Sequence, residues 1–365
     1  MKKSSNVLSL AAISILLLIL NIAFMSVAPV YASEVESESE SQVTTDEEQD
    51  YQPAPYVLNP RDLSLYPTEF EGGTIEHIEG DYMNGFHMIP DEKLYEGTII
   101  IFGGSEGTPQ FDLGVGFASA GYEVFSMFFF GMENQQPELA EVPLEFFQEI
   151  LDYYQENGGS LDEPITVYGA SKGAELALNL GTLYEEIDNL VLMAPSAYNY
   201  FGLNMAQEDL SSWTYEGQPL PFLSVTNATE EVRQEFLNTM QSGKPIAYVD
   251  VYESAITNTE EDELEEKRIK VEDFDGELLI FAGNDDQLWP SALMAEVIAE
   301  HATNEANVNI YQGAGHVFFG NGEMELPEFG TMLVGGTEEA NLEASQAYFA
   351  TLIEVVNGWH SATNE

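Results

Sequence analysis

A serine, an aspartate and a histidine stand beside glycine-containing turns at three separate places in the sequence. Ser171 is the centre of a G-x-S-x-G pattern, Asp286 comes shortly after Gly283, and His316 follows Gly313-Ala314-Gly315. A neutral imidazole can take the proton of a serine hydroxyl, while a carboxylate holds the imidazole in the correct tautomer. Brought together, these side chains would attack an acyl carbon and form an acyl-enzyme.

The residues around Ser171 predict a nucleophile elbow. A short apolar run, 165–168, is interrupted by Gly169, and good helix formers begin at Lys172. Strand, sharp turn and helix in this order lift a serine hydroxyl clear of a sheet, and the glycines leave room for the crowded backbone. The backbone N–H of Lys172 would then serve as one oxyanion donor, while its side chain is expected to be structural at the helix start.

A second G-x-S-x-G match, 103–107, centres on Ser105. Thr108-Pro109 follows it directly, so no helix starts behind this serine. Its strand also comes too early in the chain for an elbow. We therefore expect Gly104 and Ser105 to supply backbone N–H donors of the oxyanion loop, with a plain tight turn as the alternative.

The acid and the histidine are selected by position. Asp286 fits the loop that Pro290 closes, and Asp285 is the alternative acid. His316 comes after the last predicted core strand. The other histidines precede the core sheet, fall in a helix or lie near the end of the chain: His77, His87, His301 and His360. The chain order serine, acid, histidine is that of an α/β-hydrolase.

The elements needed to position these residues alternate along the chain. Buried strands are predicted at 98–102, 122–130, 165–168, 189–193, 277–282 and 308–311, and helices at 112–120, 143–157, 172–183, 291–301 and 338–356. An antiparallel hairpin, with its turn at Met83-Asn84-Gly85, precedes them. Strands alternating with helices predict an α/β class, an α/β-hydrolase fold with a mainly parallel central sheet covered on both faces. Residues 196–272 break the alternation and are interpreted as an inserted cap.

The first residues predict export. Basic Lys2 and Lys3 precede an apolar stretch and then Val30-Tyr31-Ala32, so 1–32 is interpreted as a signal peptide cleaved after Ala32, which makes the protein secreted. An uncleaved membrane anchor is the alternative. Residues 33–59 have an acidic, low-complexity composition and are expected to be a disordered leader. The catalytic domain is predicted over 60–365.

The charge balance restricts partners and conditions. Asp and Glu number 64 against 10 Lys and Arg, a formal net charge of −54. At about 1 M salt the screening length falls to ~3 Å, so such a surface suits a halophilic or alkaline setting. Nucleic acid is not expected as a partner. The chain contains no cysteine, and its sequence shows no metal-ligand spacing or nucleotide loop, so no metal or cofactor is expected.

Seven blocks, in one order over about 97–358, carry a family resemblance. They are 101–107 (IFGGSEG), 142–147 (VPLEFF), 169–177 (GASKGAELA), 212–215 (SWTY), 285–291 (DDQLWPS), 313–316 (GAGH) and 335–341 (GGTEEAN). Together they resemble the catalytic C-terminal domain of the acyl-CoA thioester hydrolase and bile acid-CoA:amino acid N-acyltransferase family. The resemblance implies a serine-dependent acyl-enzyme mechanism, with Ser171, Asp286 and His316 matching the family triad.

The chain departs from that family in two ways. Only about 40 expected ordered residues precede the strand at Thr98, too few for the immunoglobulin-like sandwich that thioesterase members carry. Export and a strongly acidic surface also fit poorly with acyl-CoA, whose phosphates would be repelled. In the family, aminoacyl-transferring members use cysteine and hydrolysing members use serine, so Ser171 favours water as the acceptor.

The expected function is therefore a secreted serine hydrolase that cleaves a small carboxylic ester or thioester. The alternatives are an acyltransferase to an amine or alcohol, and a non-catalytic secreted binding protein. Acyl length, leaving group and oligomeric state are not readable from the sequence.

Overall fold

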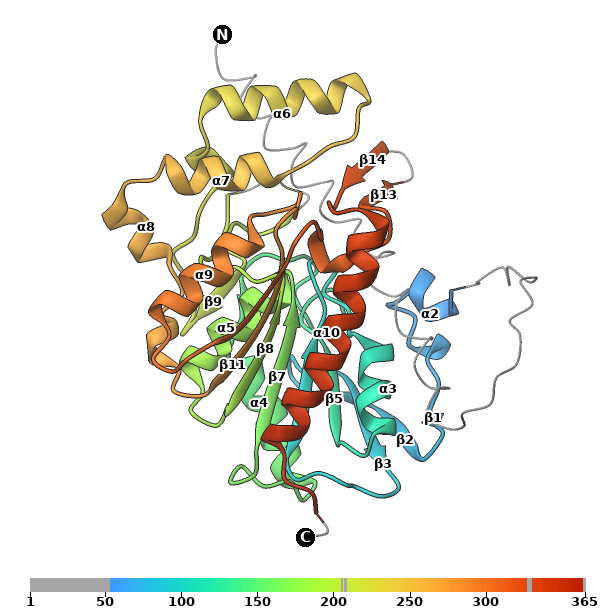
Figure 1. Ribbon diagram of the computed structural model, residues 1–365. Coiled ribbons are helices and arrows are strands. Elements are labelled where there is room, and N and C mark those ends of the chain that lie inside the picture. The colour runs from blue at the N-terminus through green and yellow to red at the C-terminus, as the bar shows by residue number, and fades with distance from the viewer. Residues whose placement is uncertain (1–52, 205, 207–208, 327–329, 364–365) are drawn as a thin grey trace, which may run out of the picture.

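A nine-stranded sheet, in the order β1-β2-β3-β5-β4-β7-β8-β11-β12, organises the chain (Figure 1). The structure, a computed structural model, describes residues 53–363 apart from 205, 207–208 and 327–329. The strands are β1 (Glu69–Phe70), β2 (Gly73–Glu79), β3 (Asn84–Pro90), β4 (Thr98–Phe102), β5 (Val124–Phe128), β7 (Ile165–Ala170), β8 (Asn189–Met193), β11 (Glu277–Gly283) and β12 (Asn307–Tyr311). From β5 to β12 all neighbours are parallel, and the predicted α/β-hydrolase fold is confirmed.

Helices cover both faces of this sheet. α3 (Phe111–Ser119) and α10 (Glu338–Trp359) pack on one face, and α4 (Phe146–Glu156), α5 (Lys172–Leu183) and α9 (Ser291–His301) on the other. The continuous apolar run of β4 follows from this arrangement, because Ile99 and Ile101 face one layer while Ile100 and Phe102 face the other.

The predicted hairpin is present, but its turn lies elsewhere. β2 and β3 pair antiparallel from Gly73↔Pro90 to Glu79↔Asn84, so the turn falls before Asn84 and Gly85 lies within β3. The prediction that Gly85 belongs to the turn is wrong, since glycine serves a different purpose there. A Cβ added to Gly85 would lie 2.6 Å from the Ser126 carbonyl oxygen, so a close approach to β5 requires the glycine.

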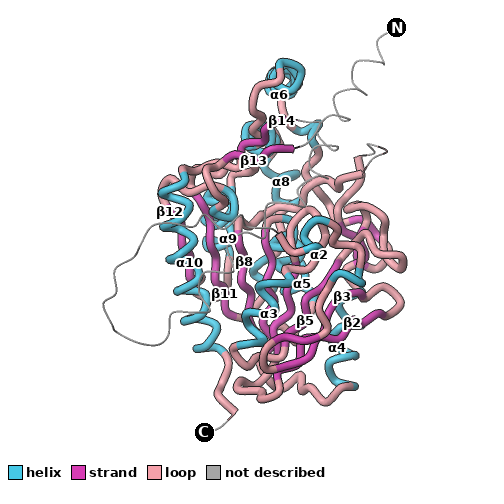
Figure 2. The backbone as a smooth tube through the Cα atoms, turned by 90° about the vertical axis from the view of Figure 1, so that its right-hand side faces the viewer, coloured by secondary structure: helices cyan, strands magenta, loops and turns pink. Residues whose placement is uncertain are grey.

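The segment 196–272 lies between β8 and β11, where the sequence indicates a cap. It contains β9 (Trp213–Tyr215), β10 (Gln218–Pro219), α6 (Glu230–Ser242), α7 (Val249–Thr257) and α8 (Glu261–Lys267). Figures 1 and 2 show α6 beyond one end of the main sheet. β9 also pairs in parallel with β6 (Val142–Pro143), so Pro143 ends a short strand and the predicted helix begins only at Phe146. A hairpin of β13 (Glu323–Leu326) and β14 (Gly330–Leu333) follows the His316 loop.

The start of the described chain is more ordered than expected. α2 (Pro55–Leu58) buries Val57, and the Tyr56 hydroxyl donates to Asp112 Oδ1 at 2.6 Å. The disordered leader was expected to reach residue 59, and this boundary is wrong because the apolar Tyr56 and Val57 pack on the domain. The predicted signal segment, 1–32, and residues 33–52 lie outside the described residues. Within the part described, no helix is long and apolar enough to cross a membrane.

We predict that Gly85→Ala lowers the free energy of unfolding by about 1–3 kcal/mol, because the new methyl group meets backbone that cannot move freely. Gly116→Ala is the matched control. Gly116 is exposed in α3, and an added Cβ meets nothing within 4 Å there, so this change should stabilise by up to about 1 kcal/mol. Urea denaturation followed by circular dichroism measures both. Equal midpoints for the two variants would contradict the packing described for β3 and β5.

Candidate active site

Ser171 occupies a strained turn between β7 and α5. Its backbone lies at φ 55° and ψ −119°, a region that costs a residue with a side chain roughly 1–3 kcal/mol. Glycines on both sides make the turn sterically feasible. A Cβ added to Gly169 would lie 2.0 Å from the Gly173 oxygen, and one added to Gly173 would lie 1.9 Å from the Gly103 oxygen. The strand–turn–helix geometry expected of an elbow is therefore present.

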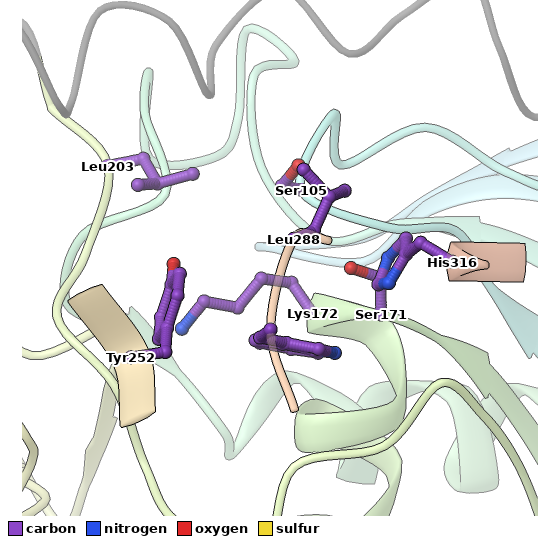
Figure 3. Close-up of a pocket in the computed structure, with 8 residues that line it drawn as sticks. Ser105, Ser171, Lys172, Leu203, Tyr252, Leu288 and His316 are labelled. Carbon is purple, nitrogen blue, oxygen red and sulfur yellow. The ribbon is translucent and has the colours of Figure 1, made fainter. Parts of the chain in front are cut away.

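The structure brings Asp286 and His316 into direct contact. His316 Nδ1 and Asp286 Oδ2 are 2.7 Å apart, and both side chains are almost completely buried. Ser171 and His316 line the same pocket, and Figure 3 shows the serine hydroxyl beside the imidazole. Residues far apart in sequence thus meet at the carboxyl ends of β7, β11 and β12, the edge where α/β sheets hold their ligands.

Asp286 is held by more than the histidine. Its Oδ1 accepts the backbone N–H groups of Leu288 at 2.9 Å and Trp289 at 3.3 Å, and its Oδ2 accepts the Ser291 hydroxyl at 2.6 Å. Asp285, the alternative acid, is exposed and its Oδ2 accepts the N–H of Gly336 instead. Asp286 is therefore the acid that contacts His316, in a position where donors stabilise its ionised form.

Asn341 fixes the loop that carries His316. This buried side chain accepts the Gly315 N–H at 2.8 Å and donates to the carbonyl oxygens of Phe319, Gly320 and Gly335. It stands in the first turn of α10, which Thr337 caps. Sequence reasoning used the 335–341 block only as a resemblance and did not assign Asn341. An asparagine just inside a capped helix was the available signal, because its amide can bind several backbone groups at once.

The predicted oxyanion donors are in part corrected. The Lys172 N–H stands at the first position of α5, where a helix offers it no internal acceptor. Ser105 lines the pocket with Ser171. Gly104 does not fit the predicted role, because its N–H already donates to Glu106 Oε1 at 2.7 Å. Sequence reasoning could not foresee this local carboxylate contact.

A buried ion pair lies directly behind the elbow. Lys172 Nζ contacts both carboxylate oxygens of Glu175, at 3.1 and 3.0 Å, and donates to Ser212 Oγ at 2.8 Å. Glu175 Oε1 also accepts Trp213 Nε1 at 2.8 Å. Burial lowers the pKa of Lys172 and raises that of Glu175, while their mutual attraction opposes both changes. The Lys172 side chain thus joins the elbow to the cap.

The pocket beside Ser171 is small and mainly apolar. Leu203 and Tyr252 line it from the cap, and Leu288 and Trp289 from the acid loop (Figure 3). The space open to the centre of a water molecule is about 20 Å³, room for one or two waters. The rings of Trp289 and His316 also pack in an edge-to-face arrangement.

The remaining histidines lie elsewhere. His87 binds Glu123, and His360 bonds Thr166 and the Glu96 carbonyl. Among the residues described, no group of His, Cys, Asp and Glu side chains is placed to hold a metal ion.

Comparison with known proteins confirms the predicted resemblance. Residues 142–320 match the family described as "BAAT / Acyl-CoA thioester hydrolase C terminal". Human acyl-coenzyme A thioesterase 6 is 23% identical over 232 residues, 62% of this chain and 50% of that protein. Mouse acyl-coenzyme A amino acid N-acyltransferase 2 is 24% identical over 245 residues, 66% of this chain and 53% of that protein. The chain therefore spans about half the length of these relatives.

Solved structures give more distant likenesses. An esterase of Pyrococcus furiosus aligns with a TM-score of 0.45 at 12% identity, covering 79% of this chain and 93% of its own. Acetyl xylan esterase 1 of a Thermoanaerobacterium species aligns with a TM-score of 0.40 at 15% identity, covering 68% of this chain and 80% of its own. The strand order described above carries the fold assignment.

We predict that Lys172→Met lowers the free energy of unfolding by about 3–5 kcal/mol, because it leaves the Glu175 carboxylate buried without its cation. The deficit should be larger at pH 8 than at pH 5. An unpaired buried carboxyl has a folded pKa above its unfolded value, so the native state loses stability as the pH rises from the unfolded toward the folded pKa. Urea denaturation at both pH values measures this difference.

The double variant Lys172→Met/Glu175→Gln is the control for this pair. It should lose less stability than the sum of the two single changes, because no unpaired charge remains. Additive losses would show that the two side chains act independently.

Proposed function

We propose that this chain is a secreted serine hydrolase that cleaves a carboxylic ester or thioester through an acyl-enzyme. The observation that carries the proposal is the 2.7 Å contact of His316 Nδ1 with Asp286 Oδ2 in the pocket that Ser171 lines. The strained elbow supports it, since a non-glycine residue at φ 55° is a costly conformation that nucleophilic serines commonly adopt.

In the proposed reaction, Ser171 Oγ attacks the acyl carbon while His316 Nε2 takes the hydroxyl proton. The negative charge that develops on the carbonyl oxygen is met by the backbone N–H groups of Lys172 and Ser105. Asp286 stabilises the imidazolium. When the tetrahedral intermediate collapses, the bond to the alkoxide or thiolate breaks and His316 returns the proton to that group. Water, deprotonated by His316, then attacks the acyl-enzyme, releasing the carboxylic acid and restoring Ser171.

Transfer to an amine or alcohol is the second candidate reaction. Mouse relatives named as acyl-coenzyme A amino acid N-acyltransferases favour it. The two reactions share the acyl-enzyme and differ only in the molecule that attacks it. Adding amine or alcohol acceptors to a single acyl donor and identifying the products by mass separates them. Ser171 in place of a cysteine favours water.

A non-catalytic binding protein is the third candidate. A fluorophosphonate probe forms a covalent bond with an activated serine, so failure to label Ser171 would favour a non-catalytic protein.

Export is proposed from residues 1–32, whose basic start and apolar stretch end at Val30-Tyr31-Ala32. Mass spectrometry of the protein from the medium and from the membrane fraction tests it: a chain beginning at Ser33 in the medium is expected, whereas a chain that retains 1–32 in the membrane fraction indicates an anchor.

We predict that Ser171→Ala and Asp286→Asn lower kcat for a p-nitrophenyl acyl ester by about 10³-fold or more and about 10²–10⁴-fold, respectively. Asp285→Asn is the matched control for the acid. It removes the neighbouring carboxylate, which does not contact His316, and should change kcat by less than about threefold. Steady-state kinetics with purified variants measures all three. Unchanged turnover by Ser171→Ala would reject the serine mechanism.

We also predict that salt distinguishes between leaving groups. The net charge of −54 repels the phosphates of coenzyme A, so kcat/KM for an acyl-CoA should rise about tenfold or more between roughly 0.05 and 1 M KCl. The N-acetylcysteamine thioester with the same acyl group is the control. Its leaving group is neutral, so its kcat/KM should change by less than about threefold. Parallel salt responses of the two thioesters would show that surface charge does not restrict the substrate.

A further inference from the structure

The loop after β4 contains a buried carboxylate that the proposed reaction does not use. Glu106 is 5% exposed, and its Oε1 accepts the Gly104 N–H at 2.7 Å. Ser105, which lines the pocket, lies between these two residues in the chain. A carboxylate in such a place is costly unless charges and donors offset its lost hydration.

This carboxylate is packed against the loop that meets the elbow. A Cβ added to Gly103 would lie 2.5 Å from Glu106 Oε1 and 2.2 Å from the Thr108 oxygen. The Gly103 oxygen in turn lies where a side chain of Gly173 would stand, 1.9 Å from the added Cβ. Carboxylate, loop backbone and elbow are therefore in continuous contact. A shift of Glu106 would be passed to the N–H of Ser105.

Arg61 supports the same loop from the segment before the sheet. Its Nη2 donates to the Glu106 carbonyl oxygen at 2.8 Å, and its guanidinium lies 5.6 Å from the Phe128 ring centre and 5.5 Å from that of Phe130. At Gly131 an added Cβ would strike this guanidinium at 2.4 Å. The surrounding residues therefore leave a space that fits the Arg61 guanidinium. In this space the guanidinium places a positive charge beside the buried carboxylate.

We propose that Glu106 is a positioning residue, whose carboxylate, supported by Arg61, fixes the oxyanion loop so that the Ser105 N–H meets the developing charge. This inference rests on the proposed hydrolase function. It concerns a role in the transition state only. Loss of the carboxylate should therefore lower kcat and leave KM nearly unchanged.

The arrangement also predicts a pH dependence. Burial raises the pKa of the Glu106 carboxyl to about 7, opposed by the Gly104 N–H, the Arg61 charge and the Thr108 hydroxyl. Tyr66 stands near Arg61, and on the elbow side the charge of Lys172 is paired with Glu175. Charge-assisted bonds are the stronger ones, so protonation of Glu106 should loosen the loop. The protonated form should therefore have a kcat close to that of a variant that lacks the carboxylate charge.

The test measures kcat and KM against pH for wild type and Glu106→Gln. The amide keeps an oxygen acceptor but cannot titrate. At pH 8 its kcat should fall about 3- to 30-fold with KM within about twofold. Protonation of Glu106 should lower the wild-type kcat by a similar factor, so the ratio of wild-type to variant kcat should fall toward one between about pH 8 and about pH 6. Since a carboxyl with a raised pKa loses stability as pH rises, the variant should also gain stability relative to the wild type between pH 5 and 8.

Glu149→Gln is the matched control. Glu149 is another carboxylate that holds a loop through backbone N–H groups, those of Tyr82 and Met83 at 3.0 Å, and it does not line the pocket. This variant should keep the wild-type kcat and the wild-type pH profile. Arg61→Met provides a second test if Glu106→Gln fails to fold. It removes the positive charge that supports the loop and leaves the loop's own sequence unchanged. It should lower kcat, and it should move the acid limb to higher pH.

Two results would overturn the proposal: a Glu106→Gln enzyme with the wild-type kcat and pH profile, or one more active than wild type at pH 8. If that variant does not fold, an Arg61→Met enzyme with the wild-type kcat and pH profile would overturn it. Fluorophosphonate labelling of the wild type distinguishes failure of the Glu106 proposal from failure of the proposed hydrolase function. If wild-type Ser171 is not labelled, the hydrolase proposal fails. If it is labelled and the variants behave as wild type, only the role of Glu106 fails.

Discussion

The site depends on one close contact between two backbone segments. Gly173, at the start of α5, faces the carbonyl oxygen of Gly103, and any side chain there would lie 1.9 Å from it. This contact sets the nucleophile elbow directly against the oxyanion loop, so the Ser171 hydroxyl and the Ser105 segment face the same pocket. Because packed backbone deforms little, the two halves of the proposed machinery have a fixed separation. The strained conformation of Ser171 is maintained by this surrounding structure.

The cap is tied to the same point by buried polar contacts. Lys172 donates to Ser212 Oγ and to the Tyr200 carbonyl oxygen, while Glu175 accepts from Trp213 Nε1. All of these groups are buried, where an unpaired charge would be far more costly than in water. The ion pair therefore specifies how the cap sits over the elbow. Since cap residues also line the pocket, the same network helps to hold the walls of the proposed substrate site.

Sequence reasoning located the elements because their patterns are local. The buried strands, the elbow around Ser171 and the histidine loop depend on apolar runs and on glycine, which act over a few residues. It could not choose firmly between Asp285 and Asp286, because that choice depends on which carboxylate the acid loop turns inward. It also assigned Gly104 as an oxyanion donor. The hydrogen bond from the Gly104 N–H to the Glu106 carboxylate could not be foreseen, because such a contact leaves no periodic pattern in the sequence. Polar contacts between segments that are distant in the sequence could not be predicted, because local residue patterns do not encode them.

The distribution of cations explains how so acidic a chain tolerates carboxylates inside. Lys and Arg together number 10, against 64 Asp and Glu, so most carboxylates must stay at the surface, hydrated and screened by salt. One buried cation, Arg268, pairs with Glu265 and Glu272 away from the pocket. Two others compensate inner carboxylates: the buried Lys172 pairs with Glu175, and the half-buried Arg61 lies beside Glu106. Asp286 relies on His316 and on neutral donors. Both cations lie at the loops that form the proposed site. At the elbow and the oxyanion loop, the positions of these two cations therefore follow the inner carboxylates that they compensate rather than the overall charge balance.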